Sequence, residues 1–442
     1  MLLRRFFLTL LCSLCVTSSH ADDLLSVYQA AVSGDPRLKM SASRLEIGRA
    51  VQRQAAGQML PQLRGQGSFS ENRQDLESTR FSAGGRDSFS GEKYNLVLTQ
   101  SLFDMPKYYS WRSQKELTLQ SLAENTDLQQ QLMLDVVTGY FKVLEAKDAL
   151  ALVGHEIVAT ERLMAQLERL YDKKLAKITE LLEVTASYDT LLADQVQAES
   201  DVAIAREALQ ELTGSPVGEL KELSDSVEFM VMEDSLEQWI ARVIAQNTAL
   251  AGLHKEIEAR RYGLKEKKSS RLPVVDLQLS HQKSDIGYEN TARPQSTTDY
   301  IGVNVNVPLF TGGVTSGRIQ EAAQRLEMAR YSYEAEYRAL IKEARDALLQ
   351  TNANVRRIEA TKKATISTLR AYQAMVKGFK LGAVTSADVL DAQRNKFRIR
   401  NDLNQARYGY VLNRTRLLKV SGLISQHELE QINQWLVAVP GQ

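Results

Sequence analysis

Cysteine, an excess of charge of one sign and long apolar runs are all missing from most of this sequence. Its two cysteines, Cys12 and Cys15, lie near the start, so we expect neither disulfides nor thiolate metal sites in the remainder. The 55 Lys and Arg residues balance 54 Asp and Glu residues, which leaves no basic excess to attract a nucleic acid. After residue 20, no apolar run approaches the roughly 18 residues of a membrane-spanning helix.

Enzyme motifs are missing as well. His155-Glu156 begins a zinc-protease pattern, but Ala159 stands where that pattern needs a second histidine. The sequence contains no P-loop, no Gly-x-Ser-x-Gly elbow and no dinucleotide fingerprint. We therefore predict that the protein is not an enzyme and has no catalytic residue, bound metal or cofactor.

The first 21 residues have the pattern of an export signal. Arg4 and Arg5 form a positive start, residues 6–16 form an apolar core, and Ser19-His20-Ala21 offers small residues at the two positions that a signal peptidase reads. We expect cleavage before Asp22. An exported chain without membrane-spanning helices can still enter a membrane as a closed β-barrel.

The remaining sequence is an internal repeat. Several short motifs recur in the same order at offsets of 207 to 212 residues: Leu60-Pro61 and Leu272-Pro273, Leu102-Phe103 and Leu309-Phe310, Leu182-Glu183 and Leu390-Asp391, Thr213-Gly214 and Ser421-Gly422. Chance would not produce all of these matches in order. We therefore predict two repeats, residues 22–215 and 216–442. A fold assignment that overlooked this repetition would be wrong.

Each repeat begins with a helical stretch, 35–59 or 235–268, and then changes to alternating polar and apolar residues. In the second repeat Val275, Leu277 and Leu279 alternate with polar residues, and strict alternation indicates a strand with one apolar face. We predict two β-hairpins, at about 62–103 and 274–309, with strands about ten residues long, which is the length of a tilted barrel strand. A soluble β-sandwich explains the alternation equally well.

Aromatic residues support the membrane alternative because they gather at the strand ends. Two belts of aromatics that flank an apolar band are typical of membrane barrels. One group lies at the helix-proximal side of the hairpins and the other beside the polar loops: Phe103, Tyr108, Tyr109, Trp111 and Phe310, and Phe89, Tyr94, Tyr288 and Tyr300.

Very long helical patterns follow the hairpins, over about 106–170 and 314–377, and each is followed by a second helix, 179–212 or 386–420. The last helix is polar on most of its circumference, which favours a tube over a packed globule. Four strands cannot close a pore, because about eight are needed even for a filled barrel. The sequence therefore requires several copies, and cyclic symmetry is the usual arrangement.

Several motifs resemble the TolC family of outer-membrane channels, and the resemblance covers nearly the whole chain after residue 21. The motifs are Leu60-Pro61-Gln62-Leu63, LTQSLFD at 98–104, PLFTGG at 308–313, LGAVTSADVLDAQ at 381–393 and the run 186–214. The resemblance implies a mixed α and β membrane protein, a homotrimer whose twelve-stranded barrel continues into a long periplasmic α-helical barrel. A mixed belt would lie at 215–237 and 424–436.

The resemblance also implies a function and partners. Members of the family give substrates passage from inner-membrane pumps across the periplasm and the outer membrane of Gram-negative bacteria, in multidrug efflux or type I protein secretion. The expected partners are a periplasmic adaptor and an inner-membrane ABC or proton-driven transporter. The alternatives are a structural periplasmic coiled-coil protein and an adaptor, neither of which has a pore.

Asp388 and Asp391 are the main candidate site. At positions i and i+3 of a helix, both carboxylates lie on one face, and a symmetric tube would repeat them around one constriction that favours cations. The resemblance implies that they form the selectivity ring at the periplasmic mouth. The alternative is that Asp388 complements the helix dipole behind a Thr385 or Ser386 cap.

The chain departs from the family near this site. Well-known members carry a tyrosine and an arginine where this chain has Phe379 and Val384. The acceptors of those lost donors are kept as Thr179 and Glu180. We expect three lysines to supply replacement ion pairs to Asp388 or Glu180, unless they only form a solvated basic turn: Lys173, Lys174 and Lys177.

The adaptor is expected to dock around the two helix turns, 176–181 and 382–388. Six residues are candidates for this contact: Leu175, Ala176, Leu181, Leu381, Gly382 and Ser386.

Overall fold

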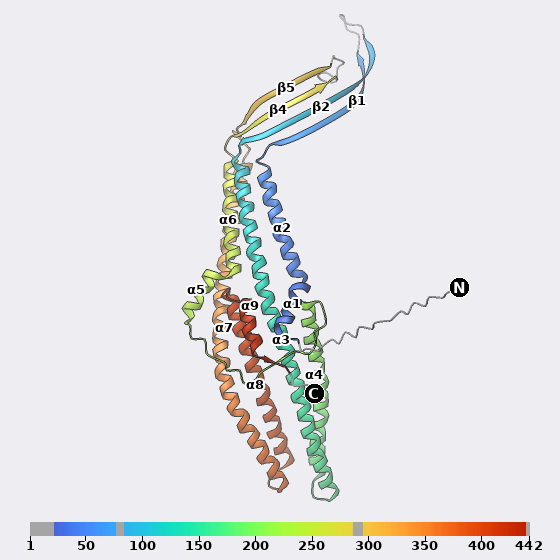
Figure 1. Ribbon diagram of the computed structural model, residues 1–442, viewed down its shortest axis with the longest axis vertical. Helices are drawn as coiled ribbons and strands as arrows, with labels where there is room; N and C mark the ends of the chain where they lie inside the picture. Colours follow the sequence, from blue (N-terminus) through green and yellow to red (C-terminus); the bar gives the residue numbers. More distant parts are fainter. Residues whose placement is uncertain (1–21, 77–83, 286–294, 439–442) are drawn as a thin grey trace, which may run out of the picture. The chain divides into compact units, whose positions relative to one another are not determined.

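The computed structural model describes residues 22–76, 84–285 and 295–438 (Figure 1). The predicted signal segment and Tyr288 lie outside the described residues. The chain divides into two compact units, and each takes segments from both predicted repeats. Unit 1 comprises Met1–Pro36, Gln130–Ile240 and Glu343–Gln442, and unit 2 comprises Arg37–Gln129 and Ala241–Lys342.

Unit 2 contains an antiparallel sheet of four strands in the order β1-β2-β4-β5. The strands are β1 (Gln62–Leu76), β2 (Gly85–Phe103), β4 (Val274–Ser284) and β5 (Ser296–Asn306). Both predicted hairpins are therefore confirmed. The first hairpin is longer than expected, with strands of 15 and 19 residues where we predicted about ten.

The two faces of this sheet differ in polarity. Directly paired residues share a face, and one row across all four strands is apolar: Leu63, Leu98, Leu279 and Ile301. The next row, on the opposite face, is Gln62, Thr99, Gln278 and Gly302. The members of this row on the edge strands are open, since Leu63 is 65% exposed and Ile301 is 73% exposed, whereas Leu98 and Leu279 are half-buried. One face of the sheet thus carries an apolar row that crosses all four strands.

Long helices make up the rest of unit 2. These are α2 (Pro36–Gly57), α6 (Thr248–Ser269) and the adjoining parts of α3 (Met105–Asp172) and α7 (Val314–Lys380). The helix predicted over 235–268 is wrong as a single element, because it is divided into α5 (Leu236–Gln246) and α6. Asn247 separates them: its side chain accepts a hydrogen bond from the Leu250 N–H at 2.9 Å and so begins a new helix.

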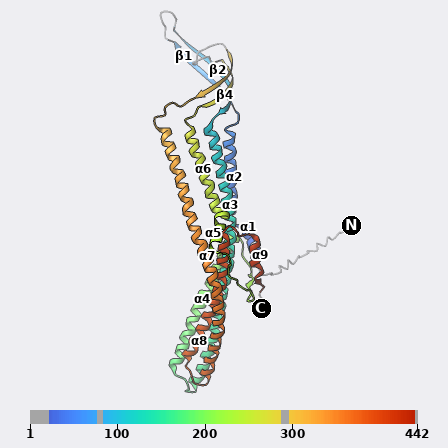
Figure 2. The ribbon, with the colours of Figure 1, turned by 90° about the vertical axis from the view of Figure 1, so that its left-hand side faces the viewer.

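Unit 1 contains the paired helices that carry the candidate site. Its elements are α1 (Leu24–Gly34), α4 (Ile178–Thr213), α8 (Ser386–Val420), α9 (Gln426–Gln434) and the remaining parts of α3 and α7. A small sheet pairs β3 (Glu222–Leu223), which lies in the first segment predicted as the mixed belt, with β6 (Leu436–Val437), which begins at the last residue of the second segment and extends one residue beyond it. The turns α3–α4 and α7–α8 lie at the same end of this unit in both views (Figures 1 and 2).

Among the described residues, no helix combines the length and the apolar character that crossing a membrane requires.

Candidate functional site

The two turns at the end of unit 1 are built in the same way. The Lys174 N–H donates to the Tyr171 carbonyl at 2.8 Å and the Leu175 N–H to the Leu170 carbonyl at 2.8 Å. The N–H groups of Gly382 and Ala383 repeat this pattern at the end of α7. Each is a Schellman motif, which places its central residue in the left-handed region, and the φ angles are 58° at Lys174 and 75° at Gly382.

Asp388 caps the helix that follows the second turn. Its carboxylate accepts hydrogen bonds from the Thr385 N–H and the Thr385 hydroxyl, both at 2.8 Å, and its own N–H donates back to Thr385 Oγ1. This reciprocal pair is a capping box. The backbone hydrogen bond from Thr385, followed by that of its hydroxyl, lowers the pKa of Asp388. The carboxylate is therefore held in its charged form, and it stabilises the start of α8 as part of the cap.

Asp391 follows one turn later and is not used in the cap. Its side chain is 80% exposed, and its nearest cation is Arg394, at 3.8 Å. The spacing of three residues brings Asp388 and Asp391 to neighbouring positions on the exposed surface of α8. Two charged carboxylates at one helix end are a suitable element for repelling anions and attracting cations.

Phe379 and Val384, the two positions where we expected this chain to lack the donors of the family, form apolar contacts. Phe379 packs against an apolar cluster of buried side chains drawn from α3, α4 and α8: Leu163, Leu167, Val184, Val389 and Leu390. Val384 lies against Gly378, where an added Cβ would meet its Cγ2 at 3.1 Å. Both side chains thus pack against apolar or backbone neighbours of their own chain.

The lysines of the first turn lie at the surface of the single chain. Lys174 and Lys177 are exposed, and within the described part of the chain neither forms an ion pair with Asp388 or Glu180. Thr179 is exposed and Glu180 is half-buried at the start of α4. Ion pairs between neighbouring copies at these lysines stay a prediction.

The six candidates for adaptor contact separate into two groups. Leu175 and Leu381 are 73% and 84% exposed, and Gly382 lies in the turn, so these three are open to a partner. Ala176 and Leu181 are partly buried against the apolar cluster. The prediction was wrong for Ser386, whose side chain is fully buried because α8 begins beneath the turn.

Sequence analysis missed a polar crossing between α8 and the α3–α4 pair. The Gln393 side chain, 1% exposed, donates to Thr160 Oγ1 at 2.6 Å and to the Glu156 carbonyl at 3.3 Å. Beside it, Arg394 donates to Ser187 Oγ at 3.2 Å. The signal was present, because Gln393 occupies the helical spacing of the buried positions Val389, Leu390 and Phe397.

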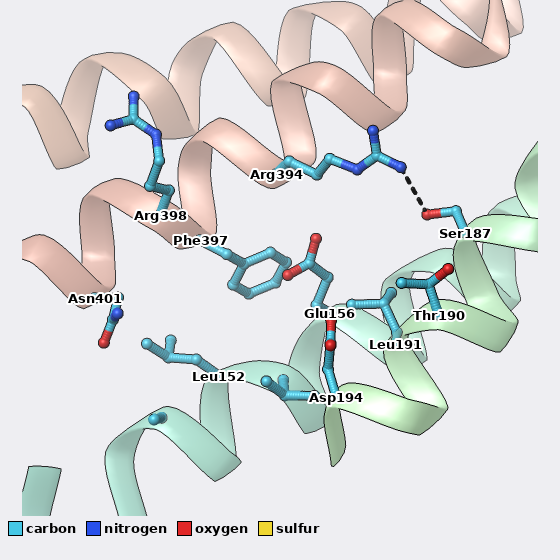
Figure 3. A pocket seen from close by; sticks show the side chains of 12 residues that line it. Leu152, Glu156, Ser187, Thr190, Leu191, Asp194, Arg394, Phe397, Arg398 and Asn401 are labelled. Atoms are coloured by element: carbon cyan, nitrogen blue, oxygen red, sulfur yellow. Dashed lines mark hydrogen bonds between the residues drawn. The ribbon is translucent and has the colours of Figure 1, made fainter. Parts of the chain in front are cut away.

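A cavity of about 350 Å³ lies next to this crossing, between α3, α4 and α8 (Figure 3). Leu152 and Leu191 line it together with four charged side chains, Glu156, Asp194, Arg394 and Arg398. Figure 3 shows Phe397 and Arg394 of α8 beside Glu156 of α3. Burial raises the pKa of Glu156, against the opposing effect of Arg394 and Lys396. Among the described residues, no group of acidic, histidine or cysteine side chains could hold a metal ion.

The fold is shared with bacterial outer-membrane channels. The solved structure of the Campylobacter jejuni CmeC outer membrane channel superimposes with a TM-score of 0.81, covering 94% of this chain and 90% of that chain at 16% identity. The fold class therefore combines a sheet of two β-hairpins with long paired helices.

Sequence comparison identifies the family. The chain matches the outer membrane efflux protein family over residues 27–215 and 239–423, and it belongs to that family. It is 29% identical to the outer membrane protein TolC of Vibrio cholerae, covering 94% of each chain. It is also 25% identical to the alkaline protease secretion protein AprF of Pseudomonas aeruginosa, covering 92% of this chain and 86% of the relative. The protein is a TolC-family channel of the outer membrane.

Proposed function

We propose that this chain forms a homotrimeric duct that receives substrates from an inner-membrane transporter through a periplasmic adaptor. The observation that carries the proposal is the sheet of unit 2: among the described residues it has four strands, no further strand pairs with β1 or β5, and an apolar row crosses all four strands on one face. Exposed edges of this kind are a liability unless another chain pairs with them. Three copies would supply twelve strands, and pairing β5 of one copy with β1 of the next would leave no edge.

The long helices of unit 1 are proposed to extend into the periplasm, with the α3–α4 and α7–α8 turns at the periplasmic mouth. Leu175, Leu381 and Gly382 are the residues we propose for adaptor contact, because they are open at these turns. The chain itself offers no nucleotide-binding motif, so the energy for transport would come from the transporter. Both a multidrug pump and a type I secretion system fit this arrangement.

Asp388 and Asp391 are proposed to form a cation-selective ring at this mouth. Their support is the exposed position of both carboxylates at the start of α8 and the lowered pKa of Asp388, which keeps that group charged. Rings of acidic side chains select cations in channels.

Single-channel conductance in a planar bilayer tests the duct and the ring together. The variant should be Asp388→Asn with Asp391→Asn, since an asparagine oxygen can still accept the Thr385 hydrogen bonds that hold the cap. We expect a cation-selective pore in the unmodified protein and a clear loss of selectivity in the variant. A control, Glu211→Gln at the other end of α4, removes one charge far from the turn and should leave selectivity unchanged.

Two outcomes would contradict the proposal in different ways. A folded trimer that conducts no ions would exclude the duct and favour a structural coiled-coil protein. A pore whose selectivity does not respond to the double substitution would retain the duct and exclude the ring.

A further inference from the structure

A groove of about 600 Å³ lies on unit 2, between α3, α6 and α7. Its lining includes three small residues, Ala259, Gly263 and Ala322, and a Cβ added at Gly263 would enter open space. Four basic side chains and one acidic side chain also line it: Arg260, Lys267, Arg318 and Arg325, with Glu321. The groove is therefore an open recess whose lining carries a net charge of +3.

Helices α6 and α7 lie side by side along this groove. They pack directly against each other, since Ile257 of α6 forms a buried cluster with Leu326 and Ala329 of α7. Helix α6 ends and α7 begins at the sheet, so the two helices run in opposite directions beneath it (Figures 1 and 2). Residues near the end of α6 therefore lie at the level of residues near the start of α7.

The four cations form two opposed pairs as a result. At 1.5 Å per residue, Lys267 and Arg318 lie about 3 and 6 Å from the ends of α6 and α7 that adjoin the sheet. Arg260 and Arg325 lie about 14 and 17 Å from the same ends. Each helix thus contributes one cation at each of two levels that are about 10 Å apart.

The acidic residues near the groove neutralise these cations only in part. Three of the four pair with a glutamate of the same helix: Arg260 with Glu256 at 2.9 Å, Lys267 with Glu266 at 2.7 Å and Arg325 with Glu321 at 2.6 Å. Such pairs within one helix are weak, and each guanidinium keeps further N–H donors. In the part of the chain that the structure describes, Arg318 forms no ion pair.

The first repeat indicates that the fold does not require these cations. The repeat offsets of 212 and 208 align the four basic positions with four uncharged residues: Gly48, Ala55, Ser110 and Leu117. In that repeat the two helices approach closely at this level, since the Thr118 hydroxyl donates to the Gly48 carbonyl at 3.0 Å. The basic groove is therefore a feature of the second repeat alone.

The groove and the aromatic residues below the first hairpin lie on different sides of α6. The Tyr262 ring stacks on Tyr109, with 6.5 Å between the ring centroids, and Tyr109 belongs to the aromatic belt expected at the membrane interface. Tyr262 and Arg260 are two residues apart and thus lie nearly opposite each other around the helix axis. If the belt faces lipid, the groove faces the interior of the proposed duct.

The chemistry of the lining favours phosphate as a ligand. Opposed cations repel each other unless an anion lies between them. Arginine is suited to phosphate because its planar guanidinium can donate two N–H groups to two phosphate oxygens at once. Two levels of cations and a net charge of +3 favour an anion with several charges over a single carboxylate.

We propose that this groove binds a multivalent phosphate anion in the interior of the duct. The inference rests on the proposed function and adds a class of solute that the channel would hold. Asp388 and Asp391 would attract cations at the mouth, whereas the groove beneath the sheet would retain solutes that carry phosphate groups.

Isothermal titration calorimetry with inorganic tripolyphosphate tests the site on the purified full chain in detergent. Arg318→Gln with Arg325→Gln should weaken binding about tenfold or more, because hydrogen bonds between charged groups are lost at both levels. Arg318→Lys with Arg325→Lys keeps the charge and should bind more tightly than the glutamine variant. Absence of binding to the folded unmodified protein would overturn the proposal.

Arg261 and Arg330 provide the matched control for this titration. They belong to the same two helices and pair with glutamates of their own helix, but they do not line the groove. Arg261→Gln with Arg330→Gln removes the same number of charges and should leave the affinity unchanged. An equal loss of affinity in this control would mean that tripolyphosphate responds only to overall charge, and the groove would then not be its site.

Lipid headgroups are the other source of phosphate, and the surrounding bilayer distinguishes the two. The titration would be repeated in nanodiscs of phosphatidylcholine and of phosphatidylglycerol. We expect equal affinities for tripolyphosphate, because a groove in the interior of the duct does not contact lipid. Weaker binding in phosphatidylglycerol would mean that the headgroup competes for the groove and would overturn its interior position.

Single-channel recording separates this inference from the duct itself. Tripolyphosphate should reduce the conductance of the unmodified channel and have a weaker effect on Arg318→Gln with Arg325→Gln. A protein that conducts ions but shows neither binding nor block would exclude the phosphate site and leave the duct intact. A protein that binds tripolyphosphate in the groove but conducts no ions would exclude the duct and, with it, the interior position.

Discussion

Lys174 and Gly382 occupy equivalent places in two Schellman turns, and only one of them is suited to its backbone. A side chain in the left-handed region costs about 1 kcal/mol, because its Cβ approaches a carbonyl oxygen. Lys174 has a φ of 58° and carries that cost, whereas Gly382, with a φ of 75°, does not.

We therefore expect Lys174→Gly to stabilise the folded protein by about 1 kcal/mol. Thermal unfolding followed by the helical circular dichroism signal would measure the change. The matched control, Gly382→Ala, should lower stability by a similar amount, about 1 kcal/mol. If Lys174→Gly lowered the transition temperature, the lysine side chain itself would have to contribute a contact.

The cap at Asp388 predicts a dependence on pH. The Thr385 hydrogen bonds lower the pKa of this carboxylate in the folded protein, so its contribution is present above the unfolded pKa and is lost as the pH falls through the folded pKa. We expect the transition temperature of Asp388→Asn to lie below that of the unmodified protein at neutral pH and to approach it in acid. A gap that stayed constant down to low pH would mean that the charge of Asp388 does not contribute to the cap.

At the scale of single residues, the sequence indicated which residues lie in a turn better than it indicated their backbone conformation or their exposure. Gly382 was recognisable as a turn residue, and the repeat offset of 208 aligns it with Lys174, so the strained position could have been found by comparing the two repeats. The exposure of a candidate was harder to predict. Ser386 was expected at the surface and is buried, because that depends on how α8 packs beneath its own turn.

Among the helices, one of the polar contacts that join α8 to α3 is fully buried. Gln393 donates to Thr160, and both side chains are almost fully buried. A buried polar group that loses its partner retains its desolvation cost, whereas removing both partners leaves an apolar contact.

We expect Thr160→Val alone to cost about 1 to 3 kcal/mol, because it leaves the Gln393 amide without that acceptor. The combination Thr160→Val with Gln393→Met should recover most of this loss. A double-mutant cycle of unfolding free energies would measure the coupling between the two side chains. If the two costs simply added, the pair would be only two separate packing positions.

Arg407 joins α8 to the segment that precedes α5. The residue is 7% exposed, and its guanidinium donates to Asp225 at 2.7 Å and to the Ser224 carbonyl at 2.6 Å. We expect Arg407→Met to cost about 1 to 3 kcal/mol and to expose the 215–235 segment to proteases, because the carbonyl loses its donor. Limited proteolysis would detect this.

Arg400 is the matched control for that experiment. It lies 4.0 Å from the same Asp225, but its side chain is 42% exposed. Arg400→Met should cost about 0 to 1 kcal/mol, as expected of an exposed ion pair. Equal effects of the two substitutions would mean that charge near Asp225, and not the buried hydrogen bonding of Arg407, holds the segment.

Helices with a long uninterrupted apolar pattern were predicted closely. Breaks between consecutive helices were not predicted. The predicted start of α8 at Ser386 and its end at Val420 are confirmed. The break at Asn247 was missed because the apolar pattern continues through it, and only the side-chain hydrogen bond to Leu250 reveals the new helix start. The Gln393–Thr160 contact could not be predicted because its partners are 233 residues apart.

At the scale of the whole molecule, function depends on surfaces that one chain leaves uncovered. An apolar row crosses one face of the sheet, and within the described part of the chain no further strand pairs with β1 or β5. Each of these is unfavourable in an isolated chain and becomes favourable only in the presence of lipid or of further copies.

The internal repeat could be recognised from sequence, but the repeats do not correspond to the compact units, since each unit combines segments of both.

Adjacent residues of β4 provide a test of which face of the sheet meets lipid. Leu279 belongs to the apolar row that crosses all four strands, and Gln278, the residue before it, belongs to the polar row. If the apolar face contacts hydrocarbon, Leu279→Arg should cost about 2 to 4 kcal/mol near the middle of the bilayer, whereas Gln278→Arg should cost about 0 to 1 kcal/mol. Unfolding from lipid vesicles by a denaturant would measure both values. Similar costs for the two variants would mean that neither face is buried in lipid, and the proposed membrane sheet would then have to be given up together with the pore.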